Sequence, residues 1–213
     1  MLKAILSISF IVVIIFAHAQ ENSVFEGKIF LSKYTLTDTL HAILIVKNNK
    51  IRLDELNKNN TLKKYTLLDI NGPEIYAFNA QRKLYTMLPV HPWSGDAEKK
   101  FEVLKTGNYK EILGYKCFQW IVKNKEKNTE VTYWVEKEHF PFFYKMMQLL
   151  NINENTSQFF LEIPDAEKVF PLLTVERSLL REWKSKIVIT DIQKEPIEDS
   201  IFDIPKDYEL FEK

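Results

Sequence analysis

The feature that most restricts how this chain can fold is a series of short apolar segments in its first part. Each of these segments is followed by a tight polar turn. The turns are rich in Asn, as in Asn48-Asn49, Asn57–Asn60 and Asn71-Gly72-Pro73. Segments of this length between such turns are typical of strands joined by hairpins, so the pattern predicts an antiparallel meander. The expected strands are Val24–Tyr34, Thr39–Val46, Lys50–Leu56, Leu62–Ile70, Ile75–Phe78 and Lys83–Leu88.

More strands are expected in the second part of the chain. Tyr115–Lys123 and Glu130–Glu136 alternate and are separated by a short polar stretch, which predicts a hairpin. Phe170–Leu180 and Ser185–Ile192 are expected to be two closing strands. The tail, Ile201–Leu210, carries apolar residues around a proline, and we expect it to pack in an extended form across the sheet.

Two segments have helical signals. After Pro141, the apolar residues of His139–Leu150 recur at spacings of three and four, which predicts a helix. Ser94-Gly95-Asp96 provides a cap for a short helix at Ala97–Leu104. The predicted fold is therefore mainly β, in the α+β class: a strongly curved antiparallel sheet with one or two helices covering one face.

The N-terminus has the pattern of a secretory signal peptide. Lys3 precedes the apolar run Ile5–Phe16, and Ala17-His18-Ala19 places small residues before Gln20. The alternative is a membrane anchor, but the apolar run has about twelve residues, fewer than the roughly 20 that span a bilayer. We expect residues 1–19 to be a leader and residues 20–213 to be a single β-rich domain without an integral membrane span.

Charge and cysteine content exclude several classes of protein. The chain has 29 basic and 29 acidic side chains, and this balance argues against a nucleic acid partner because phosphate binding needs a basic surface. Cys117 is the only cysteine, so no intramolecular disulfide can form and no lipidated cysteine can follow the leader. Its apolar neighbours predict a buried, inert thiol.

The sequence has no catalytic or metal-binding motif. His41, His91 and His139 lack the spacing of metal ligands, and no nucleophile elbow or phosphate-binding loop is present. Acidic pairs such as Asp54 and Glu55 are expected on a solvated surface. We therefore predict no enzymatic activity, no cofactor and no metal.

Apolar side chains are the remaining candidates for a functional site. Some strands, such as Thr39–Val46, are apolar on both faces, so they are either buried on both sides or border a cavity. Paired methionines occur in ordinary cores and also on surfaces that accept varied apolar ligands. The candidates for a cavity lining are Ile43, Ile45, Phe118, Trp120, Trp134, Phe142, Phe143, Met146 and Met147.

Several segments resemble one family of exported bacterial proteins. Lys110–Cys117, followed by Trp120 and Thr132–Val135, is similar to a pattern in the DUF4412 family, whose function is unknown. The opening Phe25–Ile29 and the ending Ile192–Tyr208 are also similar to that family. The part of this segment from Ile112 to Cys117 also resembles another exported group, which is named for a GLPGLI signature that this chain lacks.

The resemblance implies a fold like that of the periplasmic lipoprotein carriers. That fold is an unclosed antiparallel barrel whose concave side is plugged by helices around an apolar cavity. The resemblance identifies no catalytic residues.

Two functions follow as expectations. The first is an exported, non-enzymatic protein that binds a lipid or another amphipathic ligand. The resemblance places it in the periplasm of a Gram-negative bacterium, and the alternative location is outside the cell, as a secreted protein. The alternative is an envelope scaffold with a filled core and a protein partner. An exposed apolar patch would favour the scaffold.

Overall fold

The structure is a computed structural model, and it describes residues 25–72, 74–95 and 101–212. The predicted leader, residues 1–19, lies outside these residues. No helix within the described ranges is long and apolar enough to cross a membrane.

One curved sheet contains all the strands of the described residues. Twelve strands are present there, in the spatial order β12-β6-β5-β4-β3-β2-β1-β11-β10-β9-β8-β7. Neighbours are antiparallel except for the short β12, which runs parallel to β6. The strands are β1 (Gly27–Thr35), β2 (Thr39–Lys47), β3 (Lys50–Leu56), β4 (Leu62–Asp69), β5 (Ile75–Asn79), β6 (Leu84–Leu88), β7 (Glu102–Ile112), β8 (Tyr115–Asn124), β9 (Thr129–Lys137), β10 (Val169–Arg177), β11 (Trp183–Lys194) and β12 (Glu209–Leu210).

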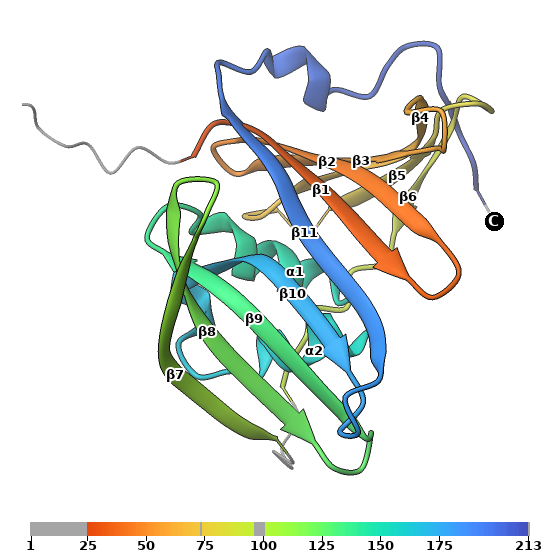
Figure 1. Ribbon diagram of the computed structural model, residues 1–213. Coiled ribbons are helices and arrows are strands. Elements are labelled where there is room, and N and C mark those ends of the chain that lie inside the picture. Colours follow the sequence, from red (N-terminus) through yellow and green to blue (C-terminus); the bar gives the residue numbers. More distant parts are fainter. Residues whose placement is uncertain (1–24, 73, 96–100, 213) are drawn as a thin grey trace, which may run out of the picture.

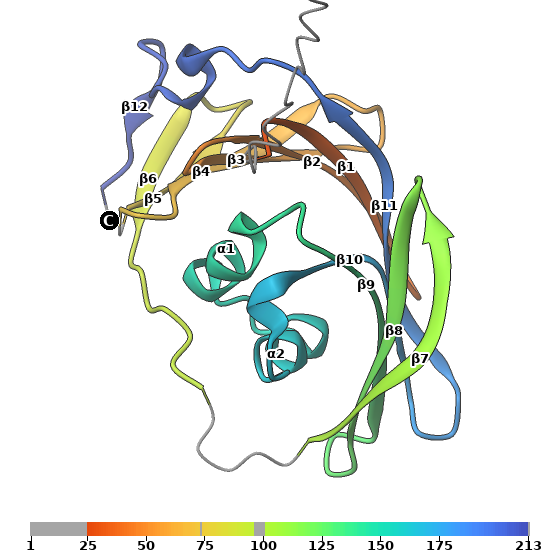
Figure 2. The same cartoon turned by 90° about the vertical axis from the view of Figure 1, so that its left-hand side faces the viewer.

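The helices lie inside the curve of this sheet. These are α1 (Phe142–Leu150) and α2 (Asn155–Leu161), followed by the 3-10 turn η1 (Ala166–Lys168). Figure 2 shows the sheet bending around both helices, with its two edges left apart: β12 and β6 lie at one edge and β7 at the other. The predicted mainly β fold, an unclosed curved sheet with helices on its concave face, is confirmed.

The sheet is continuous because its first strand pairs with β11 (Figure 1). The ladder between β1 and β11 runs from Gly27 opposite Lys194 to Thr35 opposite Ser185. Gly27 has a φ of 147°, and a Cβ there would lie 2.0 Å from the backbone oxygen of Gln193 in β11. The start of this ladder therefore requires a glycine, and Gly27 belongs to the opening segment that resembles the DUF4412 family.

A second glycine of the family-like segments forms a tight turn. Leu113 and Gly114 join β7 to β8 with φ values of 51° and 80°. Two consecutive positive φ values are typical of a two-residue hairpin whose twist matches that of its strands. Gly114 thus has a conformational role in the hairpin.

One predicted helix is wrong. Of the expected helix Ala97–Leu104, residues 97–100 lie outside the described residues, and Glu102–Leu104 begin β7 instead. Val103 lies opposite Val122 of β8. Pairing along the edge of the sheet therefore overrides the local helical signal of a short segment.

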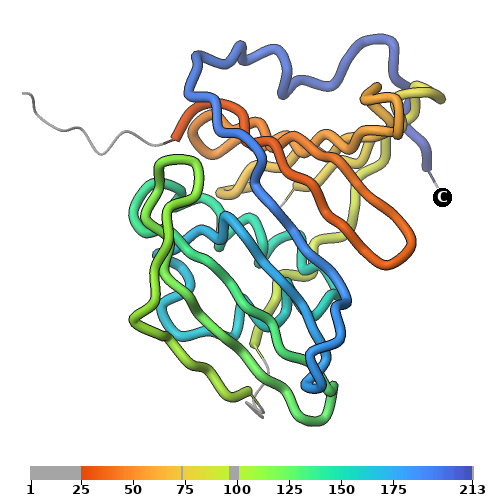
Figure 3. Tube along the Cα trace, in the orientation of Figure 1, coloured from red at the N-terminus to blue at the C-terminus, as the bar shows by residue number. Residues whose placement is uncertain are grey.

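The C-terminal tail covers the outer, convex face of the first strands (Figure 3). It is not extended throughout, because the 3-10 turn η2 (Asp199–Phe202) precedes β12. Tyr208 packs edge-on against Phe78 at 5.6 Å, and Phe78 stacks on Tyr65 at 4.3 Å. Arg52 donates a hydrogen bond to the backbone oxygen of Ile201 at 3.2 Å. The sheet is thus covered on both faces here, which explains strands that are apolar on both sides.

We expect Gly27→Ala to destabilise the protein by about 2 kcal/mol or more, because the methyl group meets the β11 backbone and the φ value strains an L residue. Urea unfolding measures the change. Gly107→Ala is the matched control, since a Cβ at Gly107 meets no atom within 4 Å. Equal stability of the two variants would contradict this account of the ladder.

Candidate ligand-binding site

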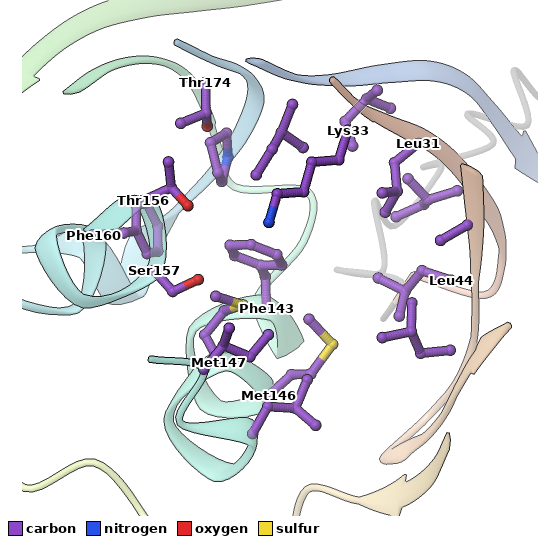
Figure 4. A pocket seen from close by; sticks show the side chains of 18 of the residues that line it. Leu31, Lys33, Leu44, Phe143, Met146, Met147, Thr156, Ser157, Phe160 and Thr174 are labelled. Atoms are coloured by element: carbon purple, nitrogen blue, oxygen red, sulfur yellow. The ribbon is translucent and has the colours of Figure 1, made fainter. Parts of the chain in front are cut away.

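A cavity of about 460 Å³ lies between the concave face of the sheet and the two helices. Its walls come from β1, β2, β10 and β11 on the sheet side and from α1 and α2 on the other side (Figure 4). Most of the wall is apolar. The apolar lining consists of Ile29, Leu31, Leu40, Ala42, Leu44, Leu53, Phe143, Met146, Met147, Leu150, Ile152, Phe160, Phe170, Pro171, Ile187 and Ile189.

Contacts on both sides of α1 hold it at the cavity. Phe142 and Met146 are buried in the core cluster formed with β1 and β2. Phe143 stands edge-on to two other rings, at 5.5 Å from Phe160 and 4.8 Å from Phe170. These perpendicular ring contacts keep α1 apart from α2 and β10 by the width of a side chain.

The segment before β7 and the end of α1 are joined by hydrogen bonds. The backbone N–H of Trp93 donates to the carbonyl oxygen of Gln148 at 2.9 Å. The side-chain amide of Asn151 donates to the carbonyl oxygen of His91 at 2.9 Å. Asn151 ends the helix in the left-handed conformation, with a φ of 40°.

Tyrosine hydroxyl groups position α2. Tyr133 of β9 donates to the backbone oxygen of Thr156 at 2.9 Å, and Tyr144 of α1 donates to that of Leu161 at 3.1 Å. Tyr133 is fully buried, and burial raises its pKa well above the usual range. Its hydroxyl group is therefore a neutral donor that fixes the first turn of α2 on the sheet.

Two ion pairs form the more exposed part of the cavity wall. Lys33 Nζ lies 2.5 Å from both carboxylate oxygens of Glu154, and Lys64 Nζ lies 2.7 Å from one oxygen of Glu55. The four side chains are 23 to 53 % exposed. We place the mouth of the cavity beside them, between β1, β3 and β4 and the chain that leads into α2.

A small polar area adjoins this mouth. The hydroxyl-bearing residues Thr156, Ser157 and Thr174 line the cavity and are only 4 to 6 % exposed. Figure 4 shows the hydroxyl groups of Thr156 and Ser157 on the side toward which the ammonium end of Lys33 extends. The cavity is thus apolar over most of its wall and polar at one end.

Three of the nine sequence-predicted lining residues lie on the cavity wall: Phe143, Met146 and Met147. Phe142, on the same helix, packs instead in the core against Phe25, with 6.0 Å between ring centroids. The helix thus presents one part of its apolar surface to the cavity and another to the core.

The predicted residues of β2 lie on the other side of the sheet. Because strand side chains alternate, Ile43 and Ile45 point to the outer face, and Leu40, Ala42 and Leu44 line the cavity. The sequence showed both faces to be apolar and carried no signal for which one is concave.

The remaining predicted residues belong to the strands at the far end of the sheet. Phe118 and Trp120 of β8 face inward and pack in the cluster around Phe159, away from the cavity. Trp134 of β9 faces outward, with Lys110 Nζ 4.1 Å from its ring centroid.

Three residues of β1 that were not among the predicted ones also line the cavity. Ile29, Leu31 and Lys33 lie on one face of the strand. A lysine at the end of a strand of alternating apolar residues was a signal that could have indicated the cavity mouth.

Titratable groups outside the cavity have structural roles. Cys117 is fully buried, and burial raises the pKa of its thiol to about 11. Glu136 is also buried, which raises its pKa, and it accepts a hydrogen bond from the backbone N–H of His139. Within the described residues, no group of three or more His, Cys, Asp or Glu side chains is arranged to hold a metal ion.

The family described as "Domain of unknown function (DUF4412)" matches residues 25–208. No curated protein matches the chain.

Solved structures resemble the chain in fold. An uncharacterized conserved protein from Thermus thermophilus has a TM-score of 0.52 and 8 % identity, and the match covers 89 % of this chain and 91 % of that one. A structure of the Pseudomonas aeruginosa MucA/MucB complex has a TM-score of 0.50 and 7 % identity, covering 89 % of this chain and 59 % of that one. A third match, a putative outer membrane lipoprotein-sorting protein domain from Vibrio parahaemolyticus, has a TM-score of 0.33 and 9 % identity, covering 83 % and 88 %. At these identities, the first two likenesses concern the fold alone.

We expect Cys117 to be unreactive in the folded protein. At about pH 8, a raised pKa leaves only a small fraction of thiolate, and burial blocks access. A colorimetric thiol reagent should label the native protein at least about a hundredfold more slowly than the same chain in denaturing urea. Rapid, complete labelling of the native protein would contradict the buried position.

Proposed function

We propose that this chain, which belongs to the DUF4412 family, is a non-enzymatic protein that binds a lipid or another amphipathic molecule inside its curved sheet. The observation that carries the proposal is the apolar cavity of about 460 Å³. Ligand sites are commonly concave, mostly apolar, and about 300 to 1,000 Å³ in volume.

The free energy of transfer supports an alkyl chain as the occupant. Burial contributes about 0.8 kcal/mol per methylene group, so about ten groups contribute ~8 kcal/mol before the cost of immobilising the ligand. The wall offers adaptable side chains in Met146 and Met147 and larger rings in Phe143 and Phe160. Such a surface can hold an alkyl chain without a cofactor.

The charged groups of the wall favour binding over catalysis. The acid Glu154 forms an ion pair with Lys33, and Glu55 forms one with Lys64. Each carboxylate at the mouth is thus paired with a lysine ammonium group. General acid–base catalysis instead uses side chains that are free to give a proton to the substrate or to take one from it.

The proposal includes the location of the protein. We propose that residues 1–19 direct export, that residues 20–213 form one domain, and that the protein works in the envelope of a Gram-negative bacterium, in the periplasm. The leader pattern and the family membership support this location. Fractionation of cells that express the full chain, followed by N-terminal sequencing, should find a periplasmic protein that begins at Gln20. A product retained in the cytoplasm with Met1 intact would contradict it.

We expect the protein to purify with a bound amphiphile when it is prepared without detergent, and native mass spectrometry should show about one ligand per chain. Ala42→Phe places a ring in the cavity from β2 and should weaken binding of an added fatty acid by about tenfold or more. Ile43→Phe, on the outer face of the same strand, should bind as the wild type does.

Circular dichroism would establish that both variants are folded. If the wild-type protein is empty and binds no fatty acid, alcohol or phospholipid, the proposed function is wrong, and the scaffold alternative should be tested by isolating envelope partners. Equal binding by the two variants would show that the ligand occupies another surface.

A further inference from the structure

We infer that the polar end of the cavity is a subsite for an anionic head group, so that the ligand is a single-chain amphiphile carrying a carboxylate or a phosphate. Lys33, Thr156, Ser157 and Thr174 form the subsite. The inference rests on the proposed function, because the alkyl chain must first occupy the cavity.

Three hydroxyl groups in the cavity wall are the first observation. Their residues, Thr156, Ser157 and Thr174, are each more than nine-tenths buried and line the cavity. Among the described residues, none of the three hydroxyl oxygens is a buried atom without a hydrogen-bond partner, so the hydroxyl groups are open to the cavity. A ligand oxygen in the cavity can therefore accept hydrogen bonds from them.

The charge of Lys33 is the second observation. Its side chain extends from β1 into the cavity toward the hydroxyl-bearing wall (Figure 4). An ammonium group only donates hydrogen bonds, so it selects an acceptor, and a charged acceptor binds more strongly than a neutral one. Together with hydroxyl donors, it forms a site for an oxyanion.

Glu154 forms an ion pair with Lys33 and can be displaced from it. The Glu154 side chain is 43 % exposed, whereas Lys33 is 24 % exposed. The carboxylate can therefore turn into solvent, where it is hydrated, while the lysine stays at the cavity. An incoming head group replaces one anion by another at the same ammonium group.

The volume of the cavity limits the ligand to one alkyl chain. A methylene group is about as large as a water molecule, whose share of liquid volume is about 30 Å³. A cavity of about 460 Å³ thus holds about fifteen such groups, which is the size of one acyl chain. Its apolar end at Ile29, Leu44 and Met146 takes the chain, and the head stays at the mouth.

Titration calorimetry with ligands that share one alkyl chain tests the inference. The ligands are tetradecanoate, tetradecyl phosphate, tetradecanol and tetradecylamine. The wild-type protein should bind at least one of the two anions about tenfold or more tightly than the alcohol, and should bind the amine no better than the alcohol. The two anionic arms distinguish a carboxylate from a phosphate.

Variants of the two partners of the ion pair should have opposite effects. Lys33→Met keeps an unbranched apolar side chain but removes the ammonium group, so it should remove the preference for the anion, while binding of the alcohol stays the same. Glu154→Gln removes the competing anion and should tighten binding of the acid severalfold. Lys64→Met is the matched control at the mouth and should keep the preference.

The double variant Lys33→Met/Glu154→Gln avoids an unpaired carboxylate, and it should bind acid and alcohol equally. Thermal unfolding establishes that each variant is folded. If the wild-type protein binds acid and alcohol equally well, or if Lys33→Met keeps the preference, the head-group subsite is wrong while the proposed function stands. If no ligand binds, both are wrong.

Discussion

The cavity depends on how α1 is held inside the sheet. Protein interiors are normally packed as densely as organic crystals, so a void of about 460 Å³ needs a support that resists collapse. Phe142 anchors the helix in the core, and Phe143 stands perpendicular to the rings of Phe160 and Phe170. Asn151 secures the end of the helix to the chain at His91. The helix is thereby fixed at a distance from β2, and the space between them stays open.

Much of the fold could be predicted from the sequence because its signals are local. The turns and the alternation of the first six strands set the meander, and the spacing of Phe142, Met146 and Leu149 set α1. The helix α2 has only seven residues, too few for a periodic pattern to show. The segment at Glu102–Leu104 became a strand because β8 offered a partner, which no local signal can reveal.

The candidate site was less predictable for a geometric reason. Alternation divides the side chains of β2 into two apolar sets, but only the direction of curvature decides that Leu44 faces the cavity and Ile45 does not. The same limit applies to Tyr133 and Trp134 in β9. Two of the polar residues of the wall, Thr156 and Ser157, belong to α2, a helix that the sequence did not indicate. Which residues meet at the cavity is therefore a property of the tertiary structure.

The ladder between β1 and β11 has a consequence for the order of folding. It joins Gly27–Thr35 to Trp183–Lys194, near opposite ends of the chain. Pairing between such distant segments is slow, and one edge of β1 stays unpaired until β11 is available to pair with it. If the chain is exported as proposed, this delay would let the polypeptide cross the membrane before its sheet is complete, and the cavity would then form only on the far side.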